Sequence, residues 1–282
     1  MGVATWSERL RQAMRQRRSL VCVGLDPDPA RLPAPLRGLP VEDAIAAFTA
    51  GIIAATGDIA CAYKPNLGFY LAHGAAGIRA LERTRAAIPA GVPAILDAKI
   101  GDIGSTAAAY AAGVFDALGF DAVTLNPYLG EDALEPFLSR PGAGLFILCK
   151  TSNPGGGDFQ DLATGGRPLH LAVAERIAAW DARYPASAGL VVGATWPEQL
   201  AAVRALCPEQ PILLPGVGAQ AGDLAAALRA GIDRHGEGLL VTSSRAIIYA
   251  SAGDDWAEAA RAAAVALRDQ IETGRAEIAA GA

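Results

Sequence analysis

The chain has 282 residues, of which 52% are hydrophobic, and a formal net charge of −5. This length fits one α/β barrel of about 250 residues or two smaller domains. The acidic balance argues against a general nucleic-acid binder, whose surface would be basic, but leaves room for a local pocket that binds a small anion.

An Arg-rich amphipathic segment comes first, and we expect its helical part, about residues 5–18, to cover one end of the fold. After it, short apolar runs alternate with helical sequence, which is typical of parallel strands buried on both faces. The predicted strands are residues 19–25, 59–63, 94–97, 122–125, 144–149, 188–192, 211–214 and 238–241. The predicted helices are residues 41–56, 77–88, 105–118, 132–139 and 169–184, two that begin near 197 and 223, and 256–277.

Eight such repeats predict a single (β/α)8 TIM barrel over about residues 19–276, preceded by the N-terminal helix. The competing architecture is an open doubly wound sheet, which would favour Gly-x-Gly-x-x-Gly after the first strand. The chain has Asp-Pro-Asp-Pro there, at residues 26–29. No linker divides the sequence, so we expect residues 1–282 to form one domain.

The four cysteines form no Cys-x-x-Cys motif, and three of them lie inside apolar runs. We interpret them as reduced core residues, which indicates a reducing compartment. No apolar stretch reaches transmembrane length, and the N-terminal segment lacks the hydrophobic core of a signal peptide. The expected location is the cytoplasm, with no membrane partner.

A charged motif follows the third predicted strand, where Asp97 and Lys99 are separated by one residue and Asp102 comes three residues later. The period of two along a strand places Asp97 and Lys99 on one face. An ion pair that closes the strand end would explain the motif without any chemistry. We favour a catalytic array, because Asp26 and Lys64 end the two preceding strands and would lie beside it.

The last two predicted strands are followed by a candidate phosphate site. Gly216 and Gly218 allow backbone N–H groups to approach a ligand closely. Arg245, which follows the eighth strand, offers a planar fork suited to phosphate oxygens. Barrels frequently bind phosphate at the loops after these two strands.

Metal binding is disfavoured by the sequence. The three histidines, at positions 73, 170 and 235, are isolated from the motifs. Asp97 and Asp102 could hold Mg²⁺, but Lys99 between them already supplies a cation. No Ser-His-Asp arrangement or Gly-x-Ser-x-Gly motif is present. We therefore expect no metal and no cofactor.

Taken together, these residues resemble the orotidine 5′-phosphate decarboxylase family over nearly the whole chain. The Asp-x-Lys-x-x-Asp motif alone recurs in related sugar-phosphate lyases, whereas the combined set is specific. The chain length, Asp-Ile-Gly and Thr-Ser-Asn-Pro-Gly-Gly are similar to the longer bacterial branch, although Gly104 replaces a proline common in the family. The set comprises Asp26, Lys64, Asp97, Lys99, Asp102, Ile103, Thr106, Gln220, Ser244 and Arg245.

The resemblance implies cofactor-free decarboxylation of orotidine 5′-monophosphate to uridine 5′-monophosphate and CO₂, the last step of de novo UMP synthesis. It implies that Lys99, Asp97, Asp102 and Lys64 are catalytic. It also implies a homodimer in which Asp102 and Thr106 reach the neighbouring subunit's site. The substrate-binding residues it implies are Asp26, Thr106, Asn126, Thr151, Ser152, Gly218, Gln220, Ser244 and Arg245.

Loss of CO₂ from pyrimidine C6 leaves electron density without a delocalising group, and a fixed ammonium can stabilise it in a water-poor site. We assign this role, and the protonation of C6, to Lys99. Two alternatives stay open. One is a sugar-phosphate lyase or aldolase on the same barrel, which would need Mg²⁺ or a Schiff base at Lys99. The other is a nucleotide-binding module that binds uridine 5′-monophosphate without turnover.

Overall fold

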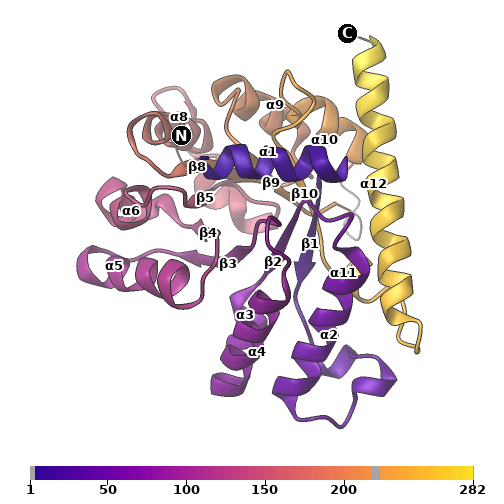
Figure 1. Ribbon diagram of the computed structural model, residues 1–282. Helices are drawn as coiled ribbons and strands as arrows, with labels where there is room; N and C mark the ends of the chain where they lie inside the picture. Colours follow the sequence, from indigo (N-terminus) through magenta and orange to yellow (C-terminus); the bar gives the residue numbers. More distant parts are fainter. Residues whose placement is uncertain (1–3, 218–222, 282) are drawn as a thin grey trace.

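The computed structural model describes residues 4–217 and 223–281, so two predicted phosphate-binding residues, Gly218 and Gln220, lie outside the described residues. Eight parallel strands form one sheet in the order β2-β1-β10-β9-β8-β5-β4-β3. Two isolated parallel bridges, Tyr63 to Ala94 and Asn66 to Asp97, join the outer strands of this order and close the sheet. The predicted TIM barrel is confirmed (Figure 1).

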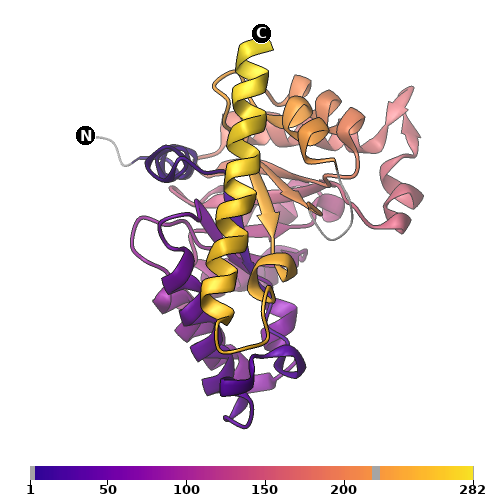
Figure 2. The same ribbon diagram turned by 90° about the vertical axis from the view of Figure 1, so that its right-hand side faces the viewer.

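The elements alternate along the chain as the repeats predict. The barrel strands are β1 (Val21–Leu25), β2 (Ala62–Pro65), β3 (Ile95–Ile100), β4 (Ala122–Leu125), β5 (Gly144–Lys150), β8 (Ser187–Val192), β9 (Ile212–Pro215) and β10 (Leu239–Ser243). The helices are α1 (Trp6–Arg17), α2 (Val41–Thr56), α3 (Leu67–Leu71), α4 (Gly74–Ala87), α5 (Gly104–Ala112), α6 (Glu131–Leu138), α7 (Gly157–Gln160), α8 (Leu169–Arg183), α9 (Pro197–Leu206), α10 (Leu224–Gly231), α11 (Arg245–Ile248) and α12 (Trp256–Gly281). Figure 2 shows α12 running along the outside of the molecule.

Helix α1 covers the amino ends of the barrel strands, as predicted. Its first turn is fixed by a capping box between Thr5 and Glu8. The Trp6 ring packs edge-on against Phe146 of β5 with 5.3 Å between ring centroids. The backbone amide of Ser7 donates to the hydroxyl of Ser187, the first residue of β8. The opposite, carboxyl ends of the strands therefore stay uncovered by this helix.

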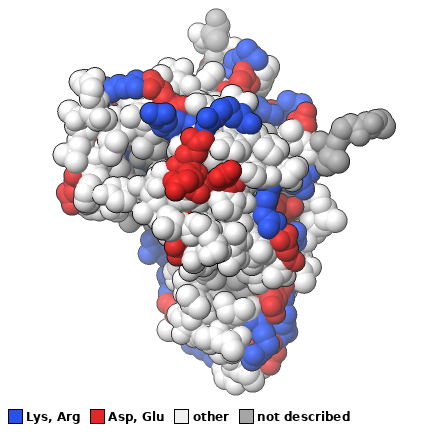
Figure 3. All heavy atoms as spheres, turned by 90° about the vertical axis from the view of Figure 1, so that its left-hand side faces the viewer, with Lys and Arg blue, Asp and Glu red and all other residues white. Residues whose placement is uncertain are grey.

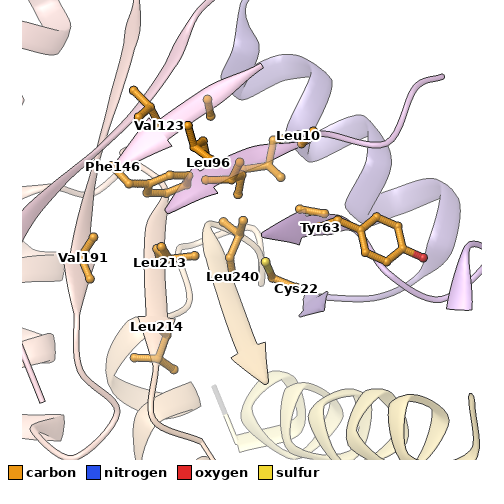
Figure 4. Packing of buried hydrophobic residues seen from close by; sticks show 14 of the residues in the cluster. Leu10, Cys22, Tyr63, Leu96, Val123, Phe146, Val191, Leu213, Leu214 and Leu240 are labelled. Carbon is orange, nitrogen blue, oxygen red and sulfur yellow. The ribbon is translucent and has the colours of Figure 1, made fainter. Parts of the chain in front are cut away.

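Buried strand side chains fill the barrel. Leu96, Val123 and Phe146, from β3, β4 and β5, lie close together in the core, and Leu213 and Leu240 come from β9 and β10 (Figure 4). The cysteines are free and buried, as expected of core residues. Within the described residues, no helix combines the length and apolar character needed to cross a bilayer.

Several details of the fold differ from the sequence-based expectation. Strand β3 continues to Ile100 instead of ending at residue 97, and the short helices α3, α7 and α11 were not predicted. The second strand begins at Ala62 instead of residue 59, because the amides of Ile59 and Ala60 donate to Thr56 in the turn that ends α2. A small antiparallel hairpin, β6 (Ala163–Thr164) and β7 (Arg167–Pro168), was not predicted. Its turn is a Gly-Gly pair at 165–166 with φ of +59° and +81°, which is a recognised hairpin signal in sequence.

Candidate active site

Charged side chains from neighbouring strands meet at the carboxyl end of the barrel. Lys64 of β2 is buried, and its Nζ donates to Asp97 Oδ2 at 2.8 Å. Lys99 Nζ donates to the other carboxylate oxygen, Oδ1, at 2.6 Å. Asp26, which follows β1, lines the same cavity as Lys64 and Asp97. One buried carboxylate thus lies between two ammonium groups, with a second carboxylate nearby.

A bulge in β3 presents Lys99. Between two paired positions of the β3–β4 ladder, residues 97–99 oppose only Thr124. Lys99 has a φ of +48°, in the left-handed region, where a non-glycine residue pays roughly 1–3 kcal/mol. The predicted period of two is therefore broken between Asp97 and Lys99, although their side chains still meet. Such strain is typical of a functional position.

The electrostatics of the array keep its buried members charged. Burial by itself raises the pKa of Asp97, but the ammonium groups of Lys64 and Lys99 outweigh burial and hold this pKa well below its usual range. Burial acts downward on the pKa of Lys64, and the carboxylates of Asp97 and Asp26 outweigh it, so this pKa is raised. Both shifts favour the ionised forms. Asp97 and Lys64 are therefore ionised at neutral pH.

We expect Asp97→Asn to lose about 3–5 kcal/mol of unfolding free energy near pH 7, because it leaves buried Lys64 without a counterion. The lowered pKa of Asp97 stabilises the fold above about pH 4, and this contribution is lost as pH falls through the lowered value. The raised pKa of Lys64 stabilises the fold below about pH 10.4, and this contribution is lost as pH rises through the raised value. Denaturant unfolding at several pH values should show the largest difference from wild type between those limits.

An exposed ion pair provides the matched control for this experiment. Arg140 and Asp116 lie 2.7 Å apart on the surface, where solvent screens the pair, so Asp116→Asn should change the unfolding free energy far less than Asp97→Asn. Two results would contradict the electrostatic role of Asp97. One is a loss of unfolding free energy in Asp97→Asn as small as that in Asp116→Asn. The other is a loss that stays the same at every pH.

A cavity of about 240 Å³ opens beside the array, between the ends of β9 and β10. Arg245 begins α11 at its edge, exposed and without an ion-pair partner in the described part of the chain. A Cβ on Gly24 would lie 1.8 Å from Ser244 Oγ, so glycine in β1 allows Ser244 to approach. The lining includes Asp26, Lys64, Asp97, Ser152, Gly216, Ser243, Ser244 and Arg245.

A second cavity, of about 470 Å³, adjoins the first and has a more apolar wall. Lys64, Asp97 and Ser152 line both cavities, whereas Lys99 lines only the second. Its apolar wall consists of Leu148, Val191, Leu213, Pro215 and Phe159. The two cavities together give one polar and one apolar compartment around the array, which suits a ligand with a charged end and a flat ring.

The loop after β5 is held by a network that the sequence did not predict. Lys150 is 1% exposed, and its Nζ donates to both carboxylate oxygens of Asp161 at 2.7 Å. Gln160 accepts from the Thr151 amide at 2.9 Å and donates to the Thr151 hydroxyl at 2.8 Å. These hydrogen bonds to Gln160 fix the position of Thr151. The next residue, Ser152, lines both cavities.

The chain contains three lysines, Lys64, Lys99 and Lys150, and all other basic residues among its 24 are arginines. Each lysine lies near the carboxyl end of a barrel strand, β2, β3 or β5. The lysines are therefore confined to the mouth of the barrel.

Three predicted site residues lie outside the lining of both cavities in this chain. Asp102 is half-buried, its Oδ1 accepts from the Ile103 amide, and no cation of the described residues lies within ion-pair distance. Thr106 lines a separate apolar groove beside α5. Asn126 caps a helical turn by accepting from the Tyr128 amide at 3.0 Å. The roles predicted for them stay predictions.

Thr124 contacts the array directly, although the sequence did not single it out. Its hydroxyl donates to Asp97 Oδ1 at 3.0 Å from the adjacent strand β4. The only available signal was a hydroxyl residue inside an otherwise apolar strand, which also occurs in ordinary cores.

In the described part of the chain, no group of three or more His, Cys, Asp and Glu side chains is arranged to hold a metal ion.

Comparison with known proteins places this site in a family. The family model for "Orotidine 5'-phosphate decarboxylase / HUMPS family" matches residues 19–263. Orotidine 5′-phosphate decarboxylase of Thermomicrobium roseum is 55% identical over 98% of this chain and 98% of its own length. The enzyme of the same name from Azoarcus sp. is 51% identical over 94% of this chain and 98% of its own length.

A solved structure agrees with these relatives. Leishmania donovani OMP decarboxylase matches with a TM-score of 0.83 and 40% identity, covering 96% of this chain and 99% of that chain. The description of the family names two groups, the orotidine 5′-phosphate decarboxylases and HUMPS. The two sequence relatives and this structure are all named as decarboxylases. The chain therefore belongs to the orotidine 5′-phosphate decarboxylase / HUMPS family, and to its decarboxylase members.

Proposed function

We propose that the array of Lys64, Asp97 and Lys99 performs the decarboxylation of orotidine 5′-monophosphate to uridine 5′-monophosphate and CO₂. The observation that carries this assignment is the single buried carboxylate of Asp97, held between two ammonium groups at 2.6 and 2.8 Å. Lys99 lies at the exposed end of the array and faces the larger cavity. A pyrimidine in that cavity would meet an ammonium group.

The charges define what each group does during the reaction. The C6–carboxylate bond breaks and leaves its electron pair on C6, where the Lys99 ammonium stabilises the developing charge. Lys99 then donates a proton to C6, which forms the new C–H bond of the product. Asp97 lies near the substrate carboxylate and disfavours the bound substrate relative to the transition state. Lys64 keeps Asp97 ionised throughout.

The two cavities suggest how the nucleotide is oriented. Arg245 and Ser244 would bind the phosphate at the end of β10, and the phosphate contacts would supply binding energy far from the reacting carbon. Asp26 Oδ1 is buried and lacks a hydrogen-bond donor in the described residues, so it is available to a ribose hydroxyl. Ser152, at the junction of the cavities, would contact the pyrimidine.

We also propose a homodimer in which Asp102 and Thr106 complete the partner's site. In support, both residues lie outside the cavities of their own chain, and Ile103 and Tyr110 beside them are 58% and 47% exposed. Thr106 and Tyr110 line an apolar groove of about 350 Å³. Figure 3, which views the side of the molecule with α5 and α6, shows areas without charged residues beside a central cluster of acidic and basic side chains. Covering the exposed apolar side chains and the groove would stabilise a dimer.

Complementation tests the reaction and the shared site together. The Lys99→Ala and Asp102→Ala variants are each expected to be nearly inactive. When equal amounts of the two are refolded together or co-expressed, so that their chains pair at random, the mixture should regain about one quarter of wild-type activity. The reason is that half of the dimers are hybrids, and each hybrid has one site with both native residues. Activity is measured as the fall in orotate-nucleotide absorbance after treatment with a chelator.

Different outcomes would contradict different parts of the proposal. A mixture no more active than its two components would contradict the shared site. Wild-type protein that requires an added divalent ion after chelation would contradict the cofactor-free reaction.

We further propose that the chain acts in the cytoplasm, because its free, buried cysteines are typical of proteins in a reducing compartment.

A further inference from the structure

The hydroxyl of Thr124 has every hydrogen-bonding position occupied within the catalytic array. Thr124 is 1% exposed on β4, and its Oγ1 donates to Asp97 Oδ1 at 3.0 Å. The same oxygen accepts from the backbone amides of Ala98 at 2.9 Å and Lys99 at 2.8 Å. A hydroxyl provides one donor and two acceptor positions, so this one is fully used.

These bonds replace the strand ladder at the bulge. Residues 97–99 of β3 oppose the single residue Thr124, so the backbone of β4 cannot pair with each of them in turn. A buried amide without a hydrogen-bond partner is unfavourable, and the bulge would leave the amides of Ala98 and Lys99 without one. The Thr124 hydroxyl accepts from both. It therefore stabilises the stretch of backbone in which Lys99 takes its φ of +48°.

We infer that Thr124 is a positioning residue for the decarboxylation, acting through Lys99 and Asp97. Its two accepted bonds hold the left-handed backbone that directs the Lys99 side chain toward Asp97 Oδ1 and the larger cavity. Its donated bond fixes the same carboxylate oxygen that the Lys99 ammonium binds at 2.6 Å. This inference rests on the role proposed for Lys99, and the experiment below separates the two.

Thr124→Val retains the shape of the side chain and removes the hydroxyl. We expect kcat for orotidine 5′-monophosphate to fall by about 10²-fold, because small displacements of a catalytic group have effects of that size. KM should change little, since the phosphate contacts lie on β10. Thr124→Ser keeps the hydroxyl and should restore most of kcat. If Thr124→Val does not fold, Thr124→Cys, whose thiol is a weak donor and acceptor, replaces it in the comparison.

Thr49→Val is the matched control for loss of a buried threonine hydroxyl. Thr49 lies in α2, where its Oγ1 donates to Ile45 O at 3.0 Å and contacts Thr84 Oγ1 at 2.8 Å. This variant should have a lower unfolding temperature and an unchanged kcat. A fall in kcat for Thr49→Val equal to that for Thr124→Val would show that general destabilisation is the cause.

A double variant then tests whether Thr124 acts through Lys99. Adding Thr124→Val to Lys99→Ala should lower kcat by much less than the 10²-fold expected in the wild-type background, because only Asp97 of the two groups that Thr124 positions is still present. Additive losses would overturn the inference, as would normal kcat in Thr124→Val or no rescue by Thr124→Ser. If Lys99→Ala itself keeps normal activity, the proposed role of Lys99 fails, which is a distinct result.

Discussion

Lys99→Ala should lower kcat for orotidine 5′-monophosphate by at least about 10⁴-fold. Removing a preorganised electrostatic contact to developing charge costs about 10²–10³-fold, and removing a general acid costs about 10²–10⁴-fold. Lys99 is assigned both roles, so its deletion removes both contributions. The measurement is the steady-state rate of absorbance loss at saturating substrate, supported by single-turnover kinetics to separate chemistry from product release.

The fold should survive this substitution, which makes the activity loss interpretable. The Lys99 side chain is 48% exposed, and Asp97 keeps its pairing with Lys64 when Lys99 is absent. Lys99→Arg is the informative companion, because guanidinium retains the charge but does not release a proton at neutral pH. Near-normal turnover by Lys99→Ala would refute its catalytic role, and near-normal turnover by Lys99→Arg would refute its role as the proton donor.

Arg245→Ala should reduce kcat/KM for orotidine 5′-monophosphate by about 10–100-fold and leave orotidine, which lacks the phosphate, unaffected. A hydrogen bond to a charged group contributes about 1.5–3 kcal/mol, and each 1.4 kcal/mol corresponds to about tenfold. Arg245 lines the polar cavity and not the larger, more apolar one, so its loss affects phosphate binding first. Both substrates are compared by their kcat/KM values.

An arginine of the outer helices provides the control for Arg245. Arg79 lies on α4 and pairs with Glu42 at 2.6 Å on the surface, so Arg79→Ala should leave both substrates unaffected. Equal losses for orotidine and its phosphate in Arg245→Ala would show that this residue does not bind the phosphate.

The barrel could be predicted because its pattern is repetitive and local. Short apolar runs between helical segments define parallel strands, and polar residues at their carboxyl ends converge once the sheet closes. Strand limits were less predictable where tertiary contacts override local preference. Pro65 lacks an N–H group yet lies within β2, where it pairs with Leu25 of β1.

The charged array was predictable in composition but not in its internal geometry. Asp97, Lys99 and Lys64 stand out in sequence as charges next to apolar strands. The bulge that aims Lys99 depends on a hydroxyl from the adjacent strand, and a threonine in a β-strand carries no special signal. Asp161, which pairs with Lys150, lies in a loop whose path follows from tertiary contacts alone. The partners proposed for Asp102 belong to a second copy of the chain, which the sequence of one copy does not place.

The use of arginine for every basic position outside the barrel mouth has a practical consequence. The side chains of Lys64 and Lys150 are 6% and 1% exposed, whereas that of Lys99 is 48% exposed. Apart from the amino terminus, an amine-selective reagent therefore meets one accessible target on this protein, and that target is the group assigned to the chemistry. Protection of Lys99 from such a reagent by a bound nucleotide would therefore report occupancy of the pocket, with the amino terminus as the other labelled amine.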